Sequence, residues 1–101
     1  MILARVVGTV VSTRKDRGLL GLKLLLAREV DAAFQATGSL VVAADAVGAG
    51  SDEIVLVASG SSARMTDVSR ERPVDAVIVG IVDSVEIAGR DVYLKHTGVA
   101  G

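Results

Sequence analysis

The chain has 101 residues and a mass of 10.3 kDa, the size of one compact domain, and it contains no Cys, which excludes a disulfide scaffold and a thiolate metal site. Hydrophobic residues make up 50% of it, which is too apolar for a disordered chain, yet no apolar run approaches the ~20 residues of a membrane span and the N-terminus does not resemble a signal peptide. Eleven Lys and Arg against twelve Asp and Glu give a net charge of −1, so we expect a soluble cytoplasmic protein that does not bind nucleic acid by charge.

The first half of the chain predicts three strands. Residues 2–11 are rich in β-branched and aliphatic side chains and end in a polar turn. Residues 22–30 have a composition that suits a helix, but glycines precede them without an N-cap signal, so we predict a second strand. A small-residue loop, 31–38, then leads to a third strand over 39–47.

The middle of the chain predicts one more strand and a short helix. A tight connection, 48–52, leads to the fourth strand, 53–58. The β pattern then breaks over 60–66, where Ser61 or Ser62 is suited to cap one or two helical turns. A charged, solvated loop follows.

The last third predicts a long fifth strand over 74–87, in which Gly80 marks a bend or a bulge. After a turn at 88–89, a short strand over 91–95 precedes a fraying tail.

These elements predict an all-β fold: a small closed OB-like β-barrel with one short helix, because closure removes strand edges in so short a chain. We expect a single domain over 1–101, with 88–101 as a C-terminal strand and flexible tail. Only Phe34 and Tyr93 are aromatic, and a chain of this size buries only about two-thirds of its surface. The aliphatic excess favours a subunit interface over the alternative of a purely monomeric aliphatic core.

The glycine-rich loop at 47–50 does not fit a phosphate cradle. No Gly-Lys-Ser/Thr opens a helix there, and Asp52 and Glu53 follow, whose charges would repel phosphate. We interpret the loop as a turn or a close backbone contact.

No enzyme signature is present. Ser61 and Ser62 lie outside a Gly-x-Ser-x-Gly pattern, and His96, the only His, is expected in an exposed tail. The carboxylates are scattered, without a calcium loop, so we expect no metal and no cofactor, although sequence leaves a paired-carboxylate acid/base site open. The basic run 14–17 is interrupted by Asp16 and is interpreted as a solvated hairpin tip.

Four blocks, 4–15, 45–57, 60–64 and 73–83, resemble in order and spacing the EutN/CcmL family of bacterial microcompartment vertex proteins. The resemblance covers residues 1 to about 87. It implies an OB-like barrel that forms a cyclic homopentamer and caps the vertices of a microcompartment shell in the cytoplasm. The partners would be further copies of itself and the hexameric and trimeric shell proteins around the encapsulated enzymes, and the protein itself would not be an enzyme.

The resemblance also implies residue roles. The contact with hexamers is expected at the segment Gly60, Ser61, Ser62, Ala63 and Arg64, with Arg64 as a hydrogen-bonding anchor and the serines capping the helix, and at the outer-rim residues Arg14 and Lys15. The alternative for the segment is a helix cap with an internal Arg–carboxylate pair. The axial opening of the ring is expected at Gly48, Ala49 and Gly50, where only small residues fit.

Two other classes of function remain at this stage. One is an OB-fold module for single-stranded nucleic acid, although such modules stack bases on aromatic side chains that are scarce here. The other is a small-molecule-binding or enzymatic barrel, which requires a convergent polar pocket with perturbed ionisable groups.

Overall fold

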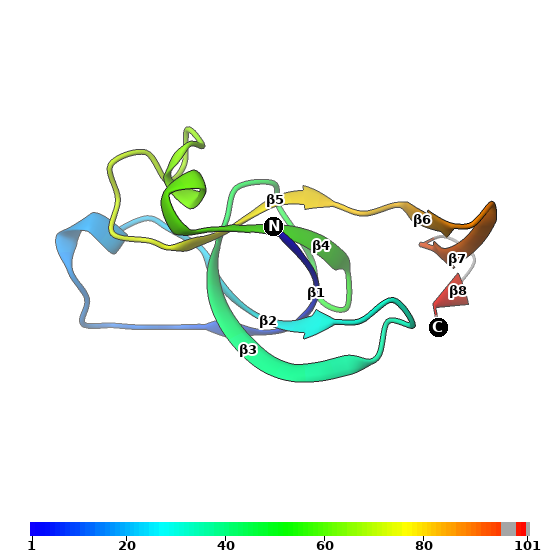
Figure 1. The fold of residues 1–101 in the computed structure, drawn as a ribbon. Coiled ribbons are helices and arrows are strands. Elements are labelled where there is room, and N and C mark those ends of the chain that lie inside the picture. The colour runs from blue at the N-terminus through cyan, green and yellow to red at the C-terminus, as the bar shows by residue number, and fades with distance from the viewer. Residues whose placement is uncertain (96–98, 101) are drawn as a thin grey trace.

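A computed structural model describes residues 1–95 and 99–100 of the chain, and its principal extents are 45 × 23 × 23 Å. Five strands close a barrel in the order β1-β2-β3-β5-β4, which confirms the predicted all-β barrel (Figure 1). The strands of the barrel are β1 (Ile2–Val10), β2 (Leu24–Val30), β3 (Ala36–Asp45), β4 (Ile54–Ser59) and β5 (Ala76–Ile81). A second sheet has the order β6-β7-β8, with β6 (Ser84–Ile87), β7 (Arg90–Leu94) and β8 (Val99–Ala100). The two helices are short 3-10 turns, η1 (Arg17–Leu19) and η2 (Gly60–Arg64).

The interior of the barrel is filled by small and β-branched side chains. On β2, Leu25 and Ala27 point inward and are buried, while Leu24 and Leu26 lie on the outer face, as the alternation of a strand requires. A barrel of five strands has a narrow lumen. Aliphatic side chains fill it without aromatic rings, and the buried cluster is Ala4, Val6, Leu25, Ala27, Ala43, Ala49, Val55, Val57, Ala76 and Ile78.

The prediction of one strand over 74–87 is wrong. The chain leaves the barrel after β5, where the backbone N–H of Val82 donates to the carbonyl of Ile54, and then enters the second sheet as β6. Because Ile54 is the first residue of β4, no partner remains in the barrel beyond this point. Only the polar pair Asp83-Ser84 marks the break in the sequence, and apolar residues stand on both sides of it. The bulge at Gly80 is confirmed, since Leu56 pairs with Gly80 and Val57 with Ile78.

Two further differences are local. The short helix lies where it was predicted, but its N-cap residue is Ser59, without a side-chain cap, and the Ser62 hydroxyl donates to the carbonyl of Ser59, so the predicted capping by Ser61 or Ser62 is wrong. Strand β3 begins at Ala36 rather than at residue 39, because Ala36 pairs with Val30 of β2.

At the C-terminus, β8 occupies part of the predicted tail, whereas His96 lies outside the described residues. None of the helices in the described residues is long and apolar enough to cross a membrane.

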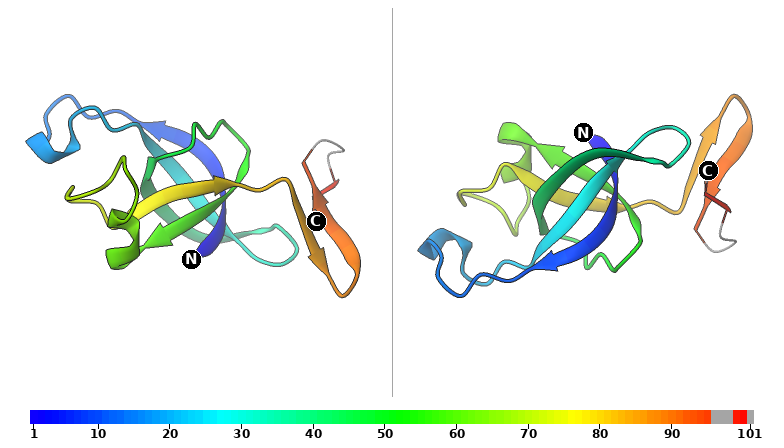
Figure 2. Two further views of the ribbon diagram at one scale, coloured as in Figure 1. Left: turned by 90° about the horizontal axis from the view of Figure 1, so that it is seen from above. Right: turned by 90° about the horizontal axis from the view of Figure 1, so that it is seen from below.

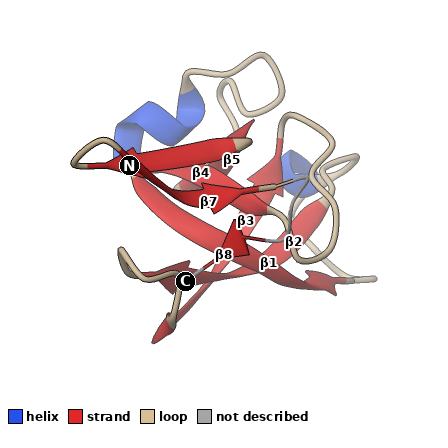
Figure 3. Ribbon diagram, turned by 90° about the vertical axis from the view of Figure 1, so that its right-hand side faces the viewer, coloured by secondary structure: helices blue, strands red, loops and turns tan. Residues whose placement is uncertain are grey.

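The second sheet lies beyond one end of the barrel, away from η1 and η2 (Figure 2). Phe34, in the β2–β3 loop, stacks on Tyr93 of β7 with ring centroids 5.2 Å apart. The two rings share a buried cluster with Val30 and Ile54 of the barrel. Figure 3 looks from this end, with β7 and β8 in front of the barrel strands. The aromatic pair therefore joins the two sheets.

Candidate functional site

The segment Gly60–Arg64 is exposed except for Ala63, whose side chain is buried against Ala44 and Val77. The guanidinium of Arg64 is exposed, and its Nη1 donates to the carbonyl of Val74 at 3.1 Å. Among the described residues no carboxylate pairs with Arg64. The alternative prediction of an internal Arg–carboxylate pair is therefore wrong for the described residues. Arg64 instead donates a hydrogen bond to a backbone carbonyl, and its positive charge faces solvent.

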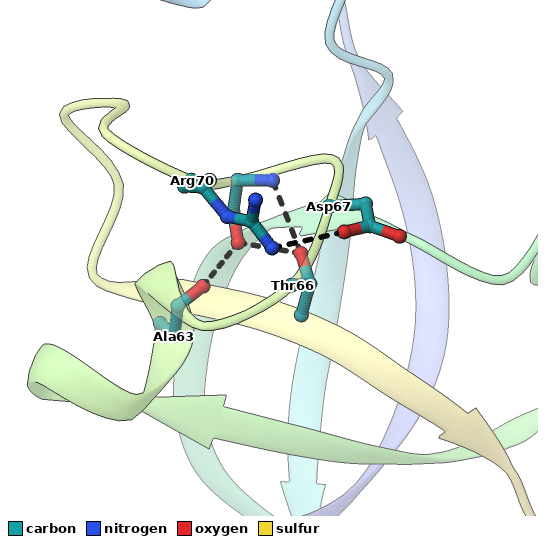
Figure 4. A network of polar contacts seen from close by, with 5 residues as sticks. Ala63, Thr66, Asp67 and Arg70 are labelled. Atoms are coloured by element: carbon teal, nitrogen blue, oxygen red, sulfur yellow. Dashed lines mark hydrogen bonds and ion pairs between the residues drawn. The ribbon is translucent and has the colours of Figure 1, made fainter.

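A polar network in the loop after η2 holds this segment in place. The Ser69 hydroxyl is fully buried and donates to the carbonyl of Ala63, while Thr66 Oγ1 accepts the backbone N–H of Ser69 at 3.0 Å. Arg70 and Asp67 form an exposed ion pair on the same loop (Figure 4). Ser69 ties the end of η2 to the following loop, so the exposed backbone of the segment has a fixed shape.

The basic residues Arg14 and Lys15 are exposed in the loop before η1. Hydrogen bonds from Arg72 hold the end of that loop: its Nη1 donates to the carbonyls of Gly18 and Leu20, at 3.3 and 2.7 Å. A side chain at Gly18 is impossible without a shift, because its Cβ would lie 2.6 Å from Pro73. The loop and η2 lie at the same end of the molecule, opposite the second sheet (Figures 1 and 2).

The glycine-rich loop is organised by Asp45. Its carboxylate accepts the backbone N–H groups of Val47, Gly48 and Ala49 at 3.1, 3.0 and 3.0 Å, as an Asx turn does. These are the donors that a bound phosphate would need, so the loop is a turn, as the sequence analysis interpreted it. Its residues differ in environment: Gly48 is exposed at φ +77, whereas Ala49 is only 2% exposed and packs into the barrel core.

An ion pair that the sequence analysis missed joins this loop to the second sheet. Lys95 Nζ contacts Glu53 Oε2, and Glu53 Oε1 accepts the backbone N–H of Gly50. The hydrogen bond from Lys95 and that from Gly50 lower the pKa of Glu53, and the bond to Glu53 raises the pKa of Lys95. The two partners lie 42 positions apart, and no local pattern links them.

We expect the Glu53→Gln variant to be less stable than the parent near neutral pH. Because the pKa of Glu53 is lowered in the folded state, its contribution is present above the ordinary glutamate value of about 4.3 and is lost as the pH falls through the lower folded pKa. The difference in melting temperature between parent and variant should therefore shrink progressively as the pH falls below the ordinary glutamate value. Thermal unfolding followed by circular dichroism from pH 3 to 7 measures it.

Asp67→Asn is the matched control, because it removes one partner of the exposed Asp67–Arg70 pair, which contributes at most about 1 kcal/mol. A Glu53→Gln difference that stays constant down to pH 3 would show that the ion pair is not its cause.

In the described part of the chain no group of three or more His, Asp or Glu side chains could hold a metal ion. A surface hollow beside β3 and the segment before β5 measures about 200 Å³, and most of its lining side chains are apolar. The site is thus a set of exposed backbone and basic side chains on a rigid aliphatic barrel.

The described residues define a small closed β-barrel that exposes a Gly-Ser-Ser-Ala-Arg segment at one end. Residues 1–83 match the family described as "Ethanolamine utilisation protein EutN/carboxysome". The carboxysome shell vertex protein CcmL of Gloeobacter violaceus is 48% identical over 95 residues, 94% of this chain and 95% of the relative. The microcompartment shell vertex protein EutN of Salmonella typhimurium is 44% identical over 94% of this chain and 96% of its own length.

The solved structures agree. The structure of Gloeobacter violaceus CcmL superposes with a TM-score of 0.91 at 48% identity, covering 95% of this chain and 99% of that one. The structure described as the GrpN pentameric microcompartment shell protein from Rhodospirillum rubrum gives a TM-score of 0.81 at 46% identity, over 87% and 100%. The chain belongs to the EutN/CcmL family, as the resemblance predicted. It is a vertex protein of a bacterial microcompartment shell, and this identity is favoured over a nucleic-acid-binding OB module.

Proposed function

We propose that the chain assembles into a ring of five that closes the vertices of its shell beside hexameric and trimeric shell proteins, and that it catalyses no reaction. The observation that carries this proposal is the end-to-end similarity to the pentameric GrpN structure, which is covered completely at 46% identity. A heterologous interface repeated around a ring closes without an unused sticky face. A sheet of hexagons closes into a shell only at pentagonal positions, so a ring of five has a geometric role that hexamers lack.

The native mass of the purified protein tests this assembly. We expect a mass five times the 10.3 kDa of one chain by native mass spectrometry. A monomer or dimer across the micromolar range would contradict the proposal. Binding of a single-stranded oligonucleotide at low salt, weakening steeply as salt rises, would instead favour the nucleic-acid module.

The contact edge with hexamers is proposed at Gly60–Arg64, with Arg14 and Lys15 beside it. Support comes from the rigid exposed backbone of the segment and from its location at the same end of the molecule as the basic loop. A guanidinium has five N–H donors. With one bond directed to Val74, Arg64 retains donors for carbonyl or carboxylate oxygens of a neighbouring subunit.

An Arg64→Ala variant is expected to form the ring normally but to co-assemble poorly with hexamers, since the exposed side chain stabilises little within its own subunit. Co-expression with a hexameric shell protein, followed by isolation of closed shells, should give at least about tenfold fewer capped shells, which corresponds to a total loss of about 1.4 kcal/mol over all contacts of one ring. Arg70→Ala is the control, since Arg70 is equally basic and exposed but pairs only with Asp67. Equal shell yields from both variants would contradict the edge assignment.

The axial opening is proposed at Gly48, Ala49 and Gly50. Within this proposal Ala49 can contribute only its backbone, because it is buried in its own barrel, and the open side of Gly48 would face the axis. A Cβ built on Gly48 meets no atom within 4 Å in the isolated chain, so any crowding there must come from other copies.

A further inference from the structure

Met65 stands at the end of the segment Gly60–Arg64 and is 79% exposed. Its backbone N–H donates to the carbonyl of Ser62 at 3.2 Å, which closes the last turn of η2. Side chains three residues apart in a 3-10 turn lie above one another. Met65 therefore continues the exposed side of the segment that begins at Ser62, while Ala63 between them is buried.

The backbone is fixed on both sides of Met65 (Figure 4). Before it, the carbonyl of Ala63 accepts the buried hydroxyl of Ser69, and after it, Thr66 Oγ1 accepts the backbone N–H of Ser69 at 3.0 Å. A long, unbranched thioether side chain is thus presented to solvent from a fixed backbone. Methionine is common at apolar contact surfaces because such a side chain adapts to the shape of a partner.

Two more apolar side chains are exposed at the same end of the molecule (Figures 1 and 2). Val68, on the loop after η2, is 37% exposed, and Leu20, just after η1, is 53% exposed. Arg72 joins the two loops, because its Nη1 donates to the carbonyl of Leu20 at 2.7 Å. Met65 therefore belongs to an end of the molecule where apolar side chains accompany the basic Arg64, and is not a single exposed apolar residue.

The composition limits where an oxidant can act on this protein. Thiols and thioethers are the side chains that hydrogen peroxide oxidises most readily, and the chain has no Cys and two methionines, Met1 and Met65. Both are exposed, at 75% and 79%. Of the two, only Met65 directly follows the segment proposed as the contact edge with hexamers.

We infer that Met65 is an oxidation site through which a peroxide weakens the contact between this protein and the hexamers of its shell. The inference rests on the proposed function and adds a regulation to its contact edge. The sulfur attacks one oxygen of hydrogen peroxide, and an S–O bond forms as the O–O bond breaks. The departing hydroxide takes the proton of the transferred oxygen and leaves as water, so the sulfur is oxidised and the peroxide is reduced. The sulfoxide is polar, and burying it against an apolar surface without a hydrogen bond is unfavourable.

Peroxide treatment of the purified protein tests the inference. Mass spectrometry of tryptic peptides reads each methionine separately, since cleavage after Arg5, Arg64 and Arg70 gives the peptides 1–5 and 65–70. The treated protein is then added to shells prepared from hexameric and trimeric shell proteins without this chain. We expect about tenfold less of the oxidised than of the untreated protein on these shells. The two methionine sulfoxide reductases, one for each epimer, should restore binding.

Met65→Leu is the matched variant, because it keeps an apolar side chain of similar volume that peroxide does not oxidise, while Met1 remains. It should bind the shells equally before and after treatment. Met65→Gln, which is polar without any oxidant, should bind as weakly as the oxidised parent.

Equal binding of the parent before and after treatment, with the 65–70 peptide fully oxidised, would overturn the inference. A loss on treatment of Met65→Leu as large as that of the parent would also overturn it, since the effect would then arise at another residue. An oxidised parent that no longer has its native mass would overturn it too, because the oxidation would act on the assembly itself and not on the contact edge. An untreated parent that does not bind the shells would instead overturn the proposed function.

Discussion

A Phe34→Ala variant is expected to lose about 3–5 kcal/mol of unfolding free energy and the docking of the second sheet on the barrel. Phe34 is 4% exposed, and its ring stacks on Tyr93 at an interplanar angle of 29°. The loss combines burial of the phenyl ring with an aromatic pair that contributes about 0.5–1.5 kcal/mol beyond burial. The second sheet consists of one short hairpin, β6 and β7, and the two-residue strand β8, so we expect it to depend on packing against the barrel through this contact.

Backbone strain does not contribute to the expected difference. Phe34 has φ +60, and alanine at that position adopts the same unfavourable conformation, so the substitution reports the side chain. Urea unfolding measures the free energy, and amide hydrogen exchange should show faster exchange in β6 and β7 than in β1–β5. Phe34→Leu is the control, because it retains most of the buried volume and should lose less. If exchange accelerates equally in both sheets, Phe34 stabilises the barrel itself and does not act as the link.

The barrel could be predicted from sequence because each of its strands carries its own signal. Strand β2 was the hardest, since its composition suits a helix, and its prediction rested on the glycines that precede it without an N-cap signal. The structure confirms the strand, with buried and half-buried side chains alternating from Leu24 to Ala27. The break between β5 and β6 could not be predicted. The apolar run continues through Val82. The chain leaves the barrel after Val82 because β4 has no further residue beyond Ile54 with which it could pair.

In the candidate site, too, features with a local sequence signal could be predicted, whereas contacts between distant residues could not. The exposed Gly60–Arg64 segment and the turn at Gly48 carry local signals, and Asp45 just before that turn is the residue that could have revealed its Asx geometry. The inward orientation of Ala49 depends on where the barrel closes, and the Glu53–Lys95 pair depends on where the second sheet docks. Neither is visible in a single sequence.

An Ala49→Trp variant is expected to unfold the barrel and not merely to crowd the ring. In the parent protein, Ala49 is 2% exposed and lies within a core of close-packed aliphatic side chains. Overpacking a core costs about 1–3 kcal/mol for small insertions, and an indole in so narrow a lumen should exceed that range. The expected result is a monomer without a cooperative thermal transition by circular dichroism. A cooperative transition within a few degrees of the parent would mean that residue 49 points out of the barrel in solution.

Because position 49 reports the barrel, the axial assignment needs a substitution that the isolated chain tolerates. Gly48→Asn and Gly89→Asn form a matched pair: the two glycines have φ +77 and +79, neither has an atom within 4 Å of a built Cβ, and asparagine accepts this conformation better than most residues. Both variants should melt within a few degrees of each other as monomers. If Gly48 lies at the axis, five asparagine side chains converge there, and only Gly48→Asn should lose the pentamer in native mass spectrometry. A Gly48→Asn pentamer as stable to dilution as that of Gly89→Asn would remove this loop from the axis.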